Sequence, residues 1–180
     1  MKATGIVRRI DDLGRIVIPK EIRRTMRIRE GDPLEIYTSR DGEVIFKKYS
    51  LLGGMEDFAS QLCETMSRST GGVCAVTDRD TVIAVAGGAR RELLGKRITA
   101  ELEQIMEKRR IYQYDGGAPA FVCDGSEKYF ATLAAPILSE GDLLGLVLFV
   151  GSEPGAAVGG DAEYKLAQTI AAFLGRHMES

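Results

Sequence analysis

The sequence predicts an α+β protein in two parts: a small β-rich N-terminal segment, followed by a larger domain in which helices and strands alternate. Three observations predict it. Short apolar segments rich in Ile, Val, Phe and Tyr fill the first fifty residues. From Met55 the apolar residues take the i, i+3, i+4 spacing of a helix. Positive charge is concentrated before residue 30, although the 180-residue chain has a net charge of −2.

The N-terminal segment contains four strand patterns and one short helix pattern. Pro19 fits the first position of a helix. Asp41-Gly42 is a two-residue hairpin signal between the last two strands, and Pro33 closes a turn before the third. The predicted strands are 4–10, 15–18, 34–39 and 43–49, and the predicted helix is 19–27.

These elements bury little apolar surface. Domains near or below about 40 residues usually need a metal, disulfides or a partner chain. This segment has no cysteine and no set of metal ligands. We therefore expect a second copy of the chain to complete it, through strands of two chains that intertwine.

The charge distribution predicts a nucleic-acid-binding end on an acidic body. Residues 1–29 hold nine Lys or Arg and three acids, a balance of +6, so the remaining residues carry −8. Arginine forks bind phosphate and read guanine edges in the major groove. Glu21 is the only acid between residues 13 and 29, which argues against ordinary solvated surface charges. The candidate DNA-binding residues are Arg8, Arg9, Arg15, Lys20, Arg23 and Arg24.

After a predicted linker at 51–54, helix and strand patterns alternate. Thr99 is a candidate N-cap, and Asp161 is a natural N-cap for the last helix, which follows Gly159-Gly160. The predicted helices are 55–66, 99 to about 110, and the C-terminal segment from 161. The predicted strands are 73–77, 81–86, 120–123, 129–135 and 143–150.

The last predicted helix is apolar on two sides. One side carries Ala167, Ala171 and Leu174, and the other carries Ile170 and Phe173. Such a helix can cover its own sheet and still offer a face to another helix. We expect it to form a helical bundle with 55–66 across a dimer interface. The alternative is that both helices simply cover one sheet within a monomer.

Catalytic and metal-binding patterns are scarce. His177 is the single histidine, and no CxxC, Walker A or GxGxxG pattern occurs. We expect neither an enzyme nor a resident cofactor or metal. Cys63, Cys74 and Cys123 lack metal-ligand spacing, which favours reduced cysteines in a cytoplasmic protein. No apolar run reaches the roughly 18 residues of a membrane span.

The basic segment closely resembles the AbrB family of bacterial transition-state regulators. The matching stretches are Ala3–Arg8, Asp12–Pro19, Glu21–Thr25, 34–37 and 44–49. The resemblance implies a swapped-hairpin β-barrel over residues 1–50, in which two chains exchange strands. In that family, the DNA contacts come from arginines matching Arg8, Arg15, Arg23 and Arg24, with a basic residue matching Arg9.

Residues 55–180 resemble a GAF-like sensory domain, in their layout and in two stretches, 76–80 and 135–147. The whole chain resembles AbrB-family regulators of late forespore genes in Bacillus-like bacteria, which implies activation and repression of sporulation genes. We expect a homotetramer on double-stranded DNA, with terminal helices of the GAF-like domains linking two barrels. The GAF-like domain then serves assembly alone or also senses a small molecule.

Two alternatives remain open. AbrB-like barrels also occur in antitoxins, which bind DNA and a toxin partner. There the C-terminal part is usually a short disordered tail, whereas here residues 55–180 have the patterns of a folded domain. An enzyme in that domain would need a nucleophile–base pair or a metal set, which the sequence lacks.

Overall fold

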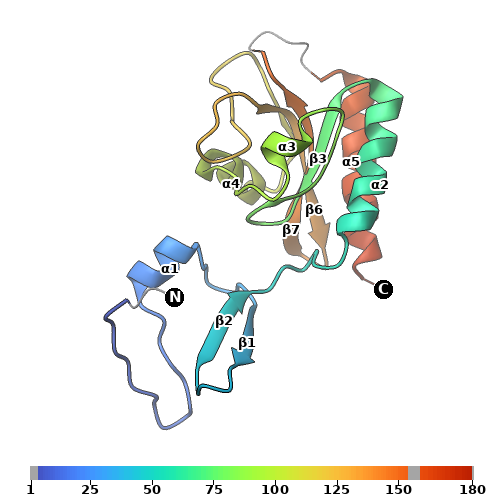
Figure 1. Cartoon of the computed structure of the whole chain (residues 1–180). Coiled ribbons are helices and arrows are strands. Elements are labelled where there is room, and N and C mark those ends of the chain that lie inside the picture. The colour runs from blue at the N-terminus through green and yellow to red at the C-terminus, as the bar shows by residue number, and fades with distance from the viewer. Residues whose placement is uncertain (1–3, 154–158, 180) are drawn as a thin grey trace. The chain divides into compact units, whose positions relative to one another are not determined.

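The structure, a computed structural model, describes residues 4–153 and 159–179 and divides the chain between Tyr49 and Ser50 into two compact units. We call them the first unit and the second unit. Helices and strands occur in both (Figure 1), as the α+β prediction requires. Residues 51–54, the predicted linker, lie in turns, and Leu52 is buried in the core of the second unit.

The first unit contains a short helix and one hairpin. Helix α1 spans Lys20–Met26, and the antiparallel strands β1 (Leu34–Thr38) and β2 (Val44–Lys48) form the hairpin. Its loop has three residues rather than the predicted two. Gly42 has a φ of 79° and donates its N–H to Ser39 O at 3.3 Å. This is the type I turn followed by a left-handed glycine that closes three-residue hairpin loops.

The predicted strands 4–10 and 15–18 are not formed in the single chain. Residues 4–18 run without a strand ladder, and only a tight turn at Asp11–Arg15 joins the two halves. A strand needs a neighbour to pair its N–H and C=O groups, and the described part of this chain supplies none here. The apolar side chains of this segment stay in solvent, with Val7 89% and Val17 72% exposed.

The first unit has no core of its own, as its small size predicts. Among its described residues, 4–49, only Pro19 is buried. Twelve of the fourteen exposed large apolar side chains in the described chain belong to this unit. They are Ile6, Val7, Ile10, Leu13, Ile16, Val17, Met26, Ile36, Tyr37, Val44, Phe46 and Tyr49.

The second unit is built on a five-stranded antiparallel sheet in the order β4-β3-β7-β6-β5. Strand β7, in the middle, is buried along nearly its whole length because both faces of the sheet are covered. The strands are β3 (Val73–Thr77), β4 (Val82–Ala86), β5 (Tyr112–Gln113), β6 (Phe130–Ser139) and β7 (Asp142–Gly151).

Helices cover both faces of this sheet (Figure 1). Helices α2 (Glu56–Thr70) and α5 (Asp161–His177) lie along one face, and α3 (Arg90–Leu93) and α4 (Ala100–Glu107) lie on the other. The two long helices cover one face of the sheet within the chain, and the predicted bundle between chains stays a prediction. No helix in the described ranges is long and apolar enough to span a membrane.

The prediction of Thr99 as the N-cap of α4 is confirmed, whereas the prediction of Asp161 as the N-cap of α5 is wrong. Thr99 Oγ1 accepts the Leu102 N–H at 3.1 Å, as a capping side chain does. The N-cap of α5 is Gly160 rather than Asp161, because the Gly160 carbonyl accepts the first helical hydrogen bond, from Tyr164 N–H at 3.0 Å. Asp161 lies in the first turn instead, where a negative charge also favours the helix.

Short elements of the second unit depart from the sequence prediction. The segment 120–123 is not a strand, since only isolated bridges pair Cys123 with Ile98 and Phe121 with Phe130. Helix α3 and strand β5 were not predicted. They have four and two residues, which is too short for a periodic pattern to show.

Candidate nucleic-acid interface

Helix α1 carries three of the candidate DNA-binding residues. Pro19, with a φ of −57°, precedes it, and the Pro19 carbonyl accepts the Arg23 N–H at 3.0 Å. At the other end Arg27 takes the left-handed conformation, and Ile28 donates its N–H to Arg23 O at 2.8 Å. This bond satisfies a carbonyl that the helix end leaves open. The exposed basic residues of the helix are Lys20, Arg23 and Arg24.

Arg15 ends a tight turn that begins at Asp11. Gly14, with a φ of 76°, donates its N–H to Asp11 O at 3.1 Å, and the Asp11 N–H donates to Arg15 O at 3.0 Å. The Asp11 carboxylate accepts the Leu13 N–H at 3.0 Å and both the Arg15 N–H and Nε–H at 2.7 Å. These bonds, first of all the one from the Arg15 backbone, hold the pKa of Asp11 below its usual value.

The other candidate residues have no acidic partner among the residues that the structure describes. The described ranges contain no hydrogen-bond or ion-pair partner for the side chains of Arg8, Arg9, Lys20 and Arg24. Arg23 donates its Nε–H to the Ile18 carbonyl at 3.2 Å, a contact that leaves its charge unpaired. Charge-assisted hydrogen bonds to phosphate are therefore open to these side chains.

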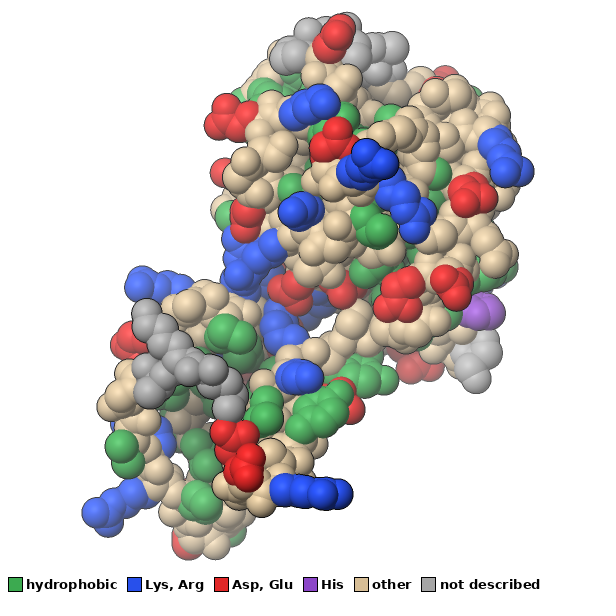
Figure 2. Space-filling view, viewed as in Figure 1, with side chains coloured by type: hydrophobic (Ala, Val, Ile, Leu, Met, Phe, Trp, Pro, Cys, Tyr) green, Lys and Arg blue, Asp and Glu red, His purple; other side chains and the backbone are tan. Residues whose placement is uncertain are grey.

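The candidate residues lie on three separate parts of the first unit. Lys20, Arg23 and Arg24 lie on α1, Arg15 lies at the end of the Asp11 turn, and Arg8 and Arg9 lie in the segment before that turn. In the view of Figure 2, Lys and Arg side chains of the first unit stand at separate places, with apolar and acidic side chains between them.

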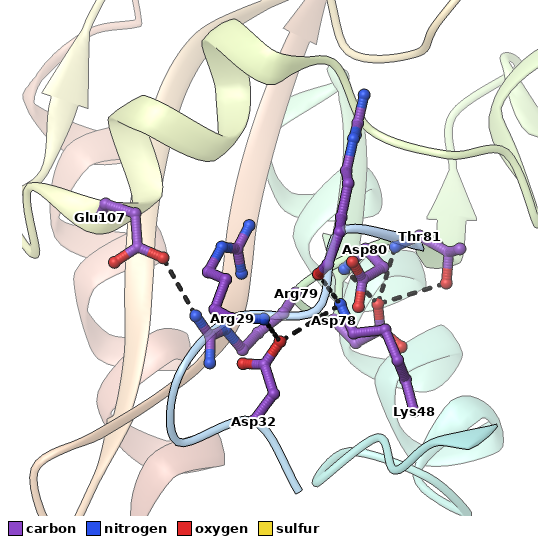
Figure 3. Close-up of polar contacts among 9 residues, drawn as sticks. Arg29, Asp32, Lys48, Asp78, Arg79, Asp80, Thr81 and Glu107 are labelled. Carbon is purple, nitrogen blue, oxygen red and sulfur yellow. Dashed lines mark hydrogen bonds and ion pairs between the residues drawn. The ribbon is translucent and has the colours of Figure 1, made fainter. Parts of the chain in front are cut away.

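Residues that the sequence analysis did not single out support α1. Lys48, at the end of β2, donates to Arg27 O at 2.8 Å and lies 3.6 Å from the Asp32 carboxylate. Asp32 accepts the Arg29 N–H at 2.8 Å (Figure 3). Lys48 is 21 residues from Arg27, too far for a local pattern to show. The role of Asp11 could have been found, because Asp-x-x-Gly is a common turn signal.

The outward side of the α2–α5 layer carries an aromatic cluster. The ring of Phe58 in α2 lies 5.0 Å from that of His177 and 5.9 Å from that of Phe173, between centroids. Phe173 is 47% exposed. His177 is exposed and stacks on the ring of Phe58. The second apolar side of α5, which carries Phe173, is therefore partly exposed to solvent.

Polar contacts in the second unit hold its loops. The Asp78 carboxylate accepts the N–H groups of Asp80 and Thr81 at 2.8 and 2.7 Å, which fixes the turn between β3 and β4 (Figure 3). Arg79 donates to Glu107 at the end of α4 at 3.0 Å. No group of three metal-ligating side chains occurs among the residues that the structure describes.

The three cysteines are free and buried. Burial raises the pKa of the Cys63 and Cys74 thiols to about 12 and that of Cys123 to about 11. Such thiols carry almost no thiolate at neutral pH, so they are poor nucleophiles and poor metal ligands.

Two protein families match the chain, one over each of its two parts. Residues 54–179 match the family described as stage V sporulation protein T C-terminal, transcription factor. Residues 7–50 match the family described as antidote-toxin recognition MazE, bacterial antitoxin.

Relatives of known name cover the whole chain. It is 46% identical over 180 residues to stage V sporulation protein T of Bacillus subtilis strain 168, across 99% of each chain. Its first part is 61% identical over 49 residues to the transition state regulatory protein AbrB of the same organism, across 27% of this chain and 50% of that protein. The resemblance of the basic segment to AbrB is thus confirmed.

The second unit has the fold of a GAF domain. A GAF domain from an Acinetobacter phosphoenolpyruvate-protein phosphotransferase aligns with 74% of this chain and 84% of that one. The TM-score is 0.56 and the identity 15%, so the likeness shows the fold alone. The prediction of a GAF-like fold is confirmed.

Proposed function

The chain belongs to the stage V sporulation protein T family of transcription factors, and from this premise we propose that two chains form one DNA-binding barrel that grips DNA with its arginines. Membership of this family makes it a DNA-binding regulator rather than an enzyme. The finer proposals concern how the barrel is built, which residues hold the DNA, and what the second unit adds.

One observation carries the proposal of a two-chain barrel: the first unit buries only Pro19 among its described residues. One face of its hairpin bears Ile36 opposite Phe46, and Val44, all exposed. The strand patterns at 4–10 and 15–18 have exposed apolar side chains, and no strand among the described residues pairs with them. A second chain that exchanges hairpins would supply both the ladder and the core, which is the swapped-hairpin arrangement.

We assign the DNA contacts to Arg8, Arg9, Arg15, Lys20, Arg23 and Arg24 of both chains. Their exposure and the scarcity of acidic partners support this assignment. Affinity then comes largely from counterion release, so neutralising about 6–10 phosphates would lower affinity by about 10³–10⁵ between 50 and 200 mM salt. DNA shape supplies much of the specificity, because few residues are placed to read bases one by one.

The experiment compares DNA binding by the full chain with that of two double variants. Arg23→Ala with Arg24→Ala removes two exposed charges from α1. Arg90→Ala with Arg91→Ala removes two exposed charges from the second unit and is the matched control. We expect the first double variant to bind DNA more weakly. The slope of its log affinity against log salt concentration should fall by about two for each chain. The second double variant should stay close to the parent in both. Equal binding by all three proteins would contradict the assignment.

The second unit is proposed to join two barrels through α2 and α5. The half-exposed Phe173 and its cluster with Phe58 and His177 support this assembly. Linked binding modules gain avidity of about 10²–10⁴ over one module. Sedimentation equilibrium of the full chain tests it: a tetramer mass is expected, and a dimer mass would contradict it.

A small-molecule effector of the GAF-like unit is a second role, and it rests on fold analogy alone. A thermal-shift screen tests it, since a ligand that binds the folded unit raises its melting temperature. A screen of nucleotides, amino acids and other small metabolites without a stabilising compound would favour assembly as its role.

By its likeness to the Bacillus subtilis protein, this chain is proposed to act in the cytoplasm of the forespore and to activate and repress late sporulation genes. Transcript profiles of sporulating cells with and without the gene test this directly. Unchanged late transcripts would contradict it.

The antitoxin function is not favoured. The match of residues 7–50 to an antitoxin family concerns only the DNA-binding part, and a folded GAF-like unit stands where a toxin-binding tail would be expected. Co-purification of a small toxin with the full chain would reverse this choice.

A further inference from the structure

The turn between Asp11 and Arg15 contains a carboxylate with two separable tasks. Its Oδ1 atom accepts the backbone N–H groups of Leu13 and Arg15 at 3.0 and 2.7 Å. Its Oδ2 atom accepts the Arg15 Nε–H at 2.7 Å. The first task shapes the backbone of the turn, and the second fixes the direction of the arginine side chain.

The pairing leaves the outer end of the arginine free. Arg15 remains 70% exposed in its ion pair with Asp11. A guanidinium has five N–H donors, and the Nε–H is only one of them. The four N–H groups on Nη1 and Nη2 make no hydrogen bond within the described chain. They keep the fork geometry that suits phosphate or a guanine edge.

We propose that Asp11 is a positioning residue for DNA recognition, holding Arg15 by its Nε so that the terminal nitrogens of the guanidinium meet the DNA in a fixed orientation. The inference rests on the proposed function of this unit as a DNA-binding barrel. Asp11 acts through Arg15 and makes no contact with DNA itself.

This arrangement has an electrostatic cost that makes the proposal testable. A carboxylate close to DNA repels phosphate and lowers affinity for every sequence alike. Exposed ion pairs also contribute little to stability. A fixed arginine, in contrast, favours sequences whose phosphates and bases match its orientation. Asp11 should therefore lower general affinity and raise the preference for matching DNA.

The substitution Asp11→Asn separates the two tasks. The asparagine Oδ1 can still accept the two backbone N–H groups of the turn, but its amide nitrogen is a donor and faces the Arg15 Nε–H. The matched control is Asp12→Asn, which makes the same change of charge one residue away. The Asp12 side chain has no hydrogen-bond or ion-pair partner in the part of the chain that the structure describes.

The measurement is the ratio of two dissociation constants for the full-length protein. One probe is a duplex that the parent protein selects from a random pool, and the other is a duplex of the same composition in shuffled order. We expect Asp12→Asn to tighten binding to both probes by a similar factor. We expect Asp11→Asn to lower the preference for the selected duplex by at least about fivefold, the low end for one misdirected bidentate arginine contact.

A double-mutant cycle distinguishes positioning from a loss of folding. Arg15→Lys keeps the charge but lacks the fork, so adding Asp11→Asn to it should lower the preference no further. If Asp11→Asn matches Asp12→Asn, or if its effect persists fully in the Arg15→Lys background, the proposal is overturned. If the parent selects no duplex and binds none, the proposed function fails and the inference falls with it.

Discussion

Replacing Ile36 with alanine tests whether a second chain covers the apolar face of the β1–β2 hairpin. Ile36 stands opposite Phe46 in the register of the two strands, and it is 62% exposed in the single chain. The opposite face carries Tyr37, whose ring lies 4.7 Å from Lys47 Nζ and whose hydroxyl bonds to Glu35. The apolar face is therefore the one that a partner chain should bury.

The size of the effect follows from the exposed fraction. Ile36→Ala removes three carbons, each worth about 0.8 kcal/mol when buried. Only a partner chain can bury the 62% of Ile36 that is exposed in the single chain. Scaled by this fraction, the lost free energy of burial is about 1.5 kcal/mol per chain and about 3 kcal/mol per dimer. This corresponds to roughly a hundredfold larger population of open first units, because about 1.4 kcal/mol is a factor of ten.

The assay is the rate at which trypsin cleaves the first unit of the full chain, where lysines and arginines are dense. Cleavage tracks the population of the open form when opening and closing are fast. We expect Ile36→Ala to accelerate cleavage by roughly a hundredfold. The control Tyr37→Ala also removes an exposed apolar side chain, but from the polar face, and should have little effect. Equal rates for parent and Ile36→Ala would refute the buried face, since a solvent-exposed isoleucine can be truncated at little cost.

Two further predictions concern the second unit. Gly175→Ala should destabilise the second unit by about 1–3 kcal/mol, because a Cβ at Gly175 would lie 2.0 Å from the Leu138 carbonyl oxygen. Calorimetry should therefore show a lower melting temperature. An unchanged melting temperature would contradict the close approach of α5 to β6. A thiol reagent at about pH 8 should react with Cys63, Cys74 and Cys123 only after denaturation, since burial raises the pKa of each thiol. The stability that the protonated thiols contribute is complete below about pH 9, the pKa of a thiol in the unfolded chain. It declines as the pH rises toward about 11–12, the pKa values in the folded protein. Rapid labelling of the native protein would show that the thiols are accessible.

Sequence reasoning succeeded where the signal is local. Pro19 and the basic run after it predicted α1 to within a residue at each end. Thr99 predicted the cap of α4, because a capping hydroxyl needs only the N–H three residues on. The charge imbalance of the first 29 residues pointed to nucleic acid without any knowledge of the fold.

It failed where a residue's role depends on distant partners. The apolar segments at 4–10 and 15–18 have strand composition, but hydrogen-bond partners decide whether they become strands, and the described residues of the single chain supply no strand ladder there. Lys48 supports the end of α1 from 21 residues away. One local signal also failed: Asp161 was assigned as a cap from its residue type, whereas the neighbouring Gly160 is the N-cap.

The sequence by itself determined the two-part α+β architecture, the basic character of the first unit and the positions of most helices and strands. These follow from periodicity, turn chemistry and charge, which are properties of neighbouring residues. Only the tertiary structure decided that α2 and α5 cover the same face of one sheet, that Lys48 supports the end of α1 from β2, and that Phe173 stays 47% exposed. Burial and side-chain direction depend on what packs against each residue, and no local pattern contains that information.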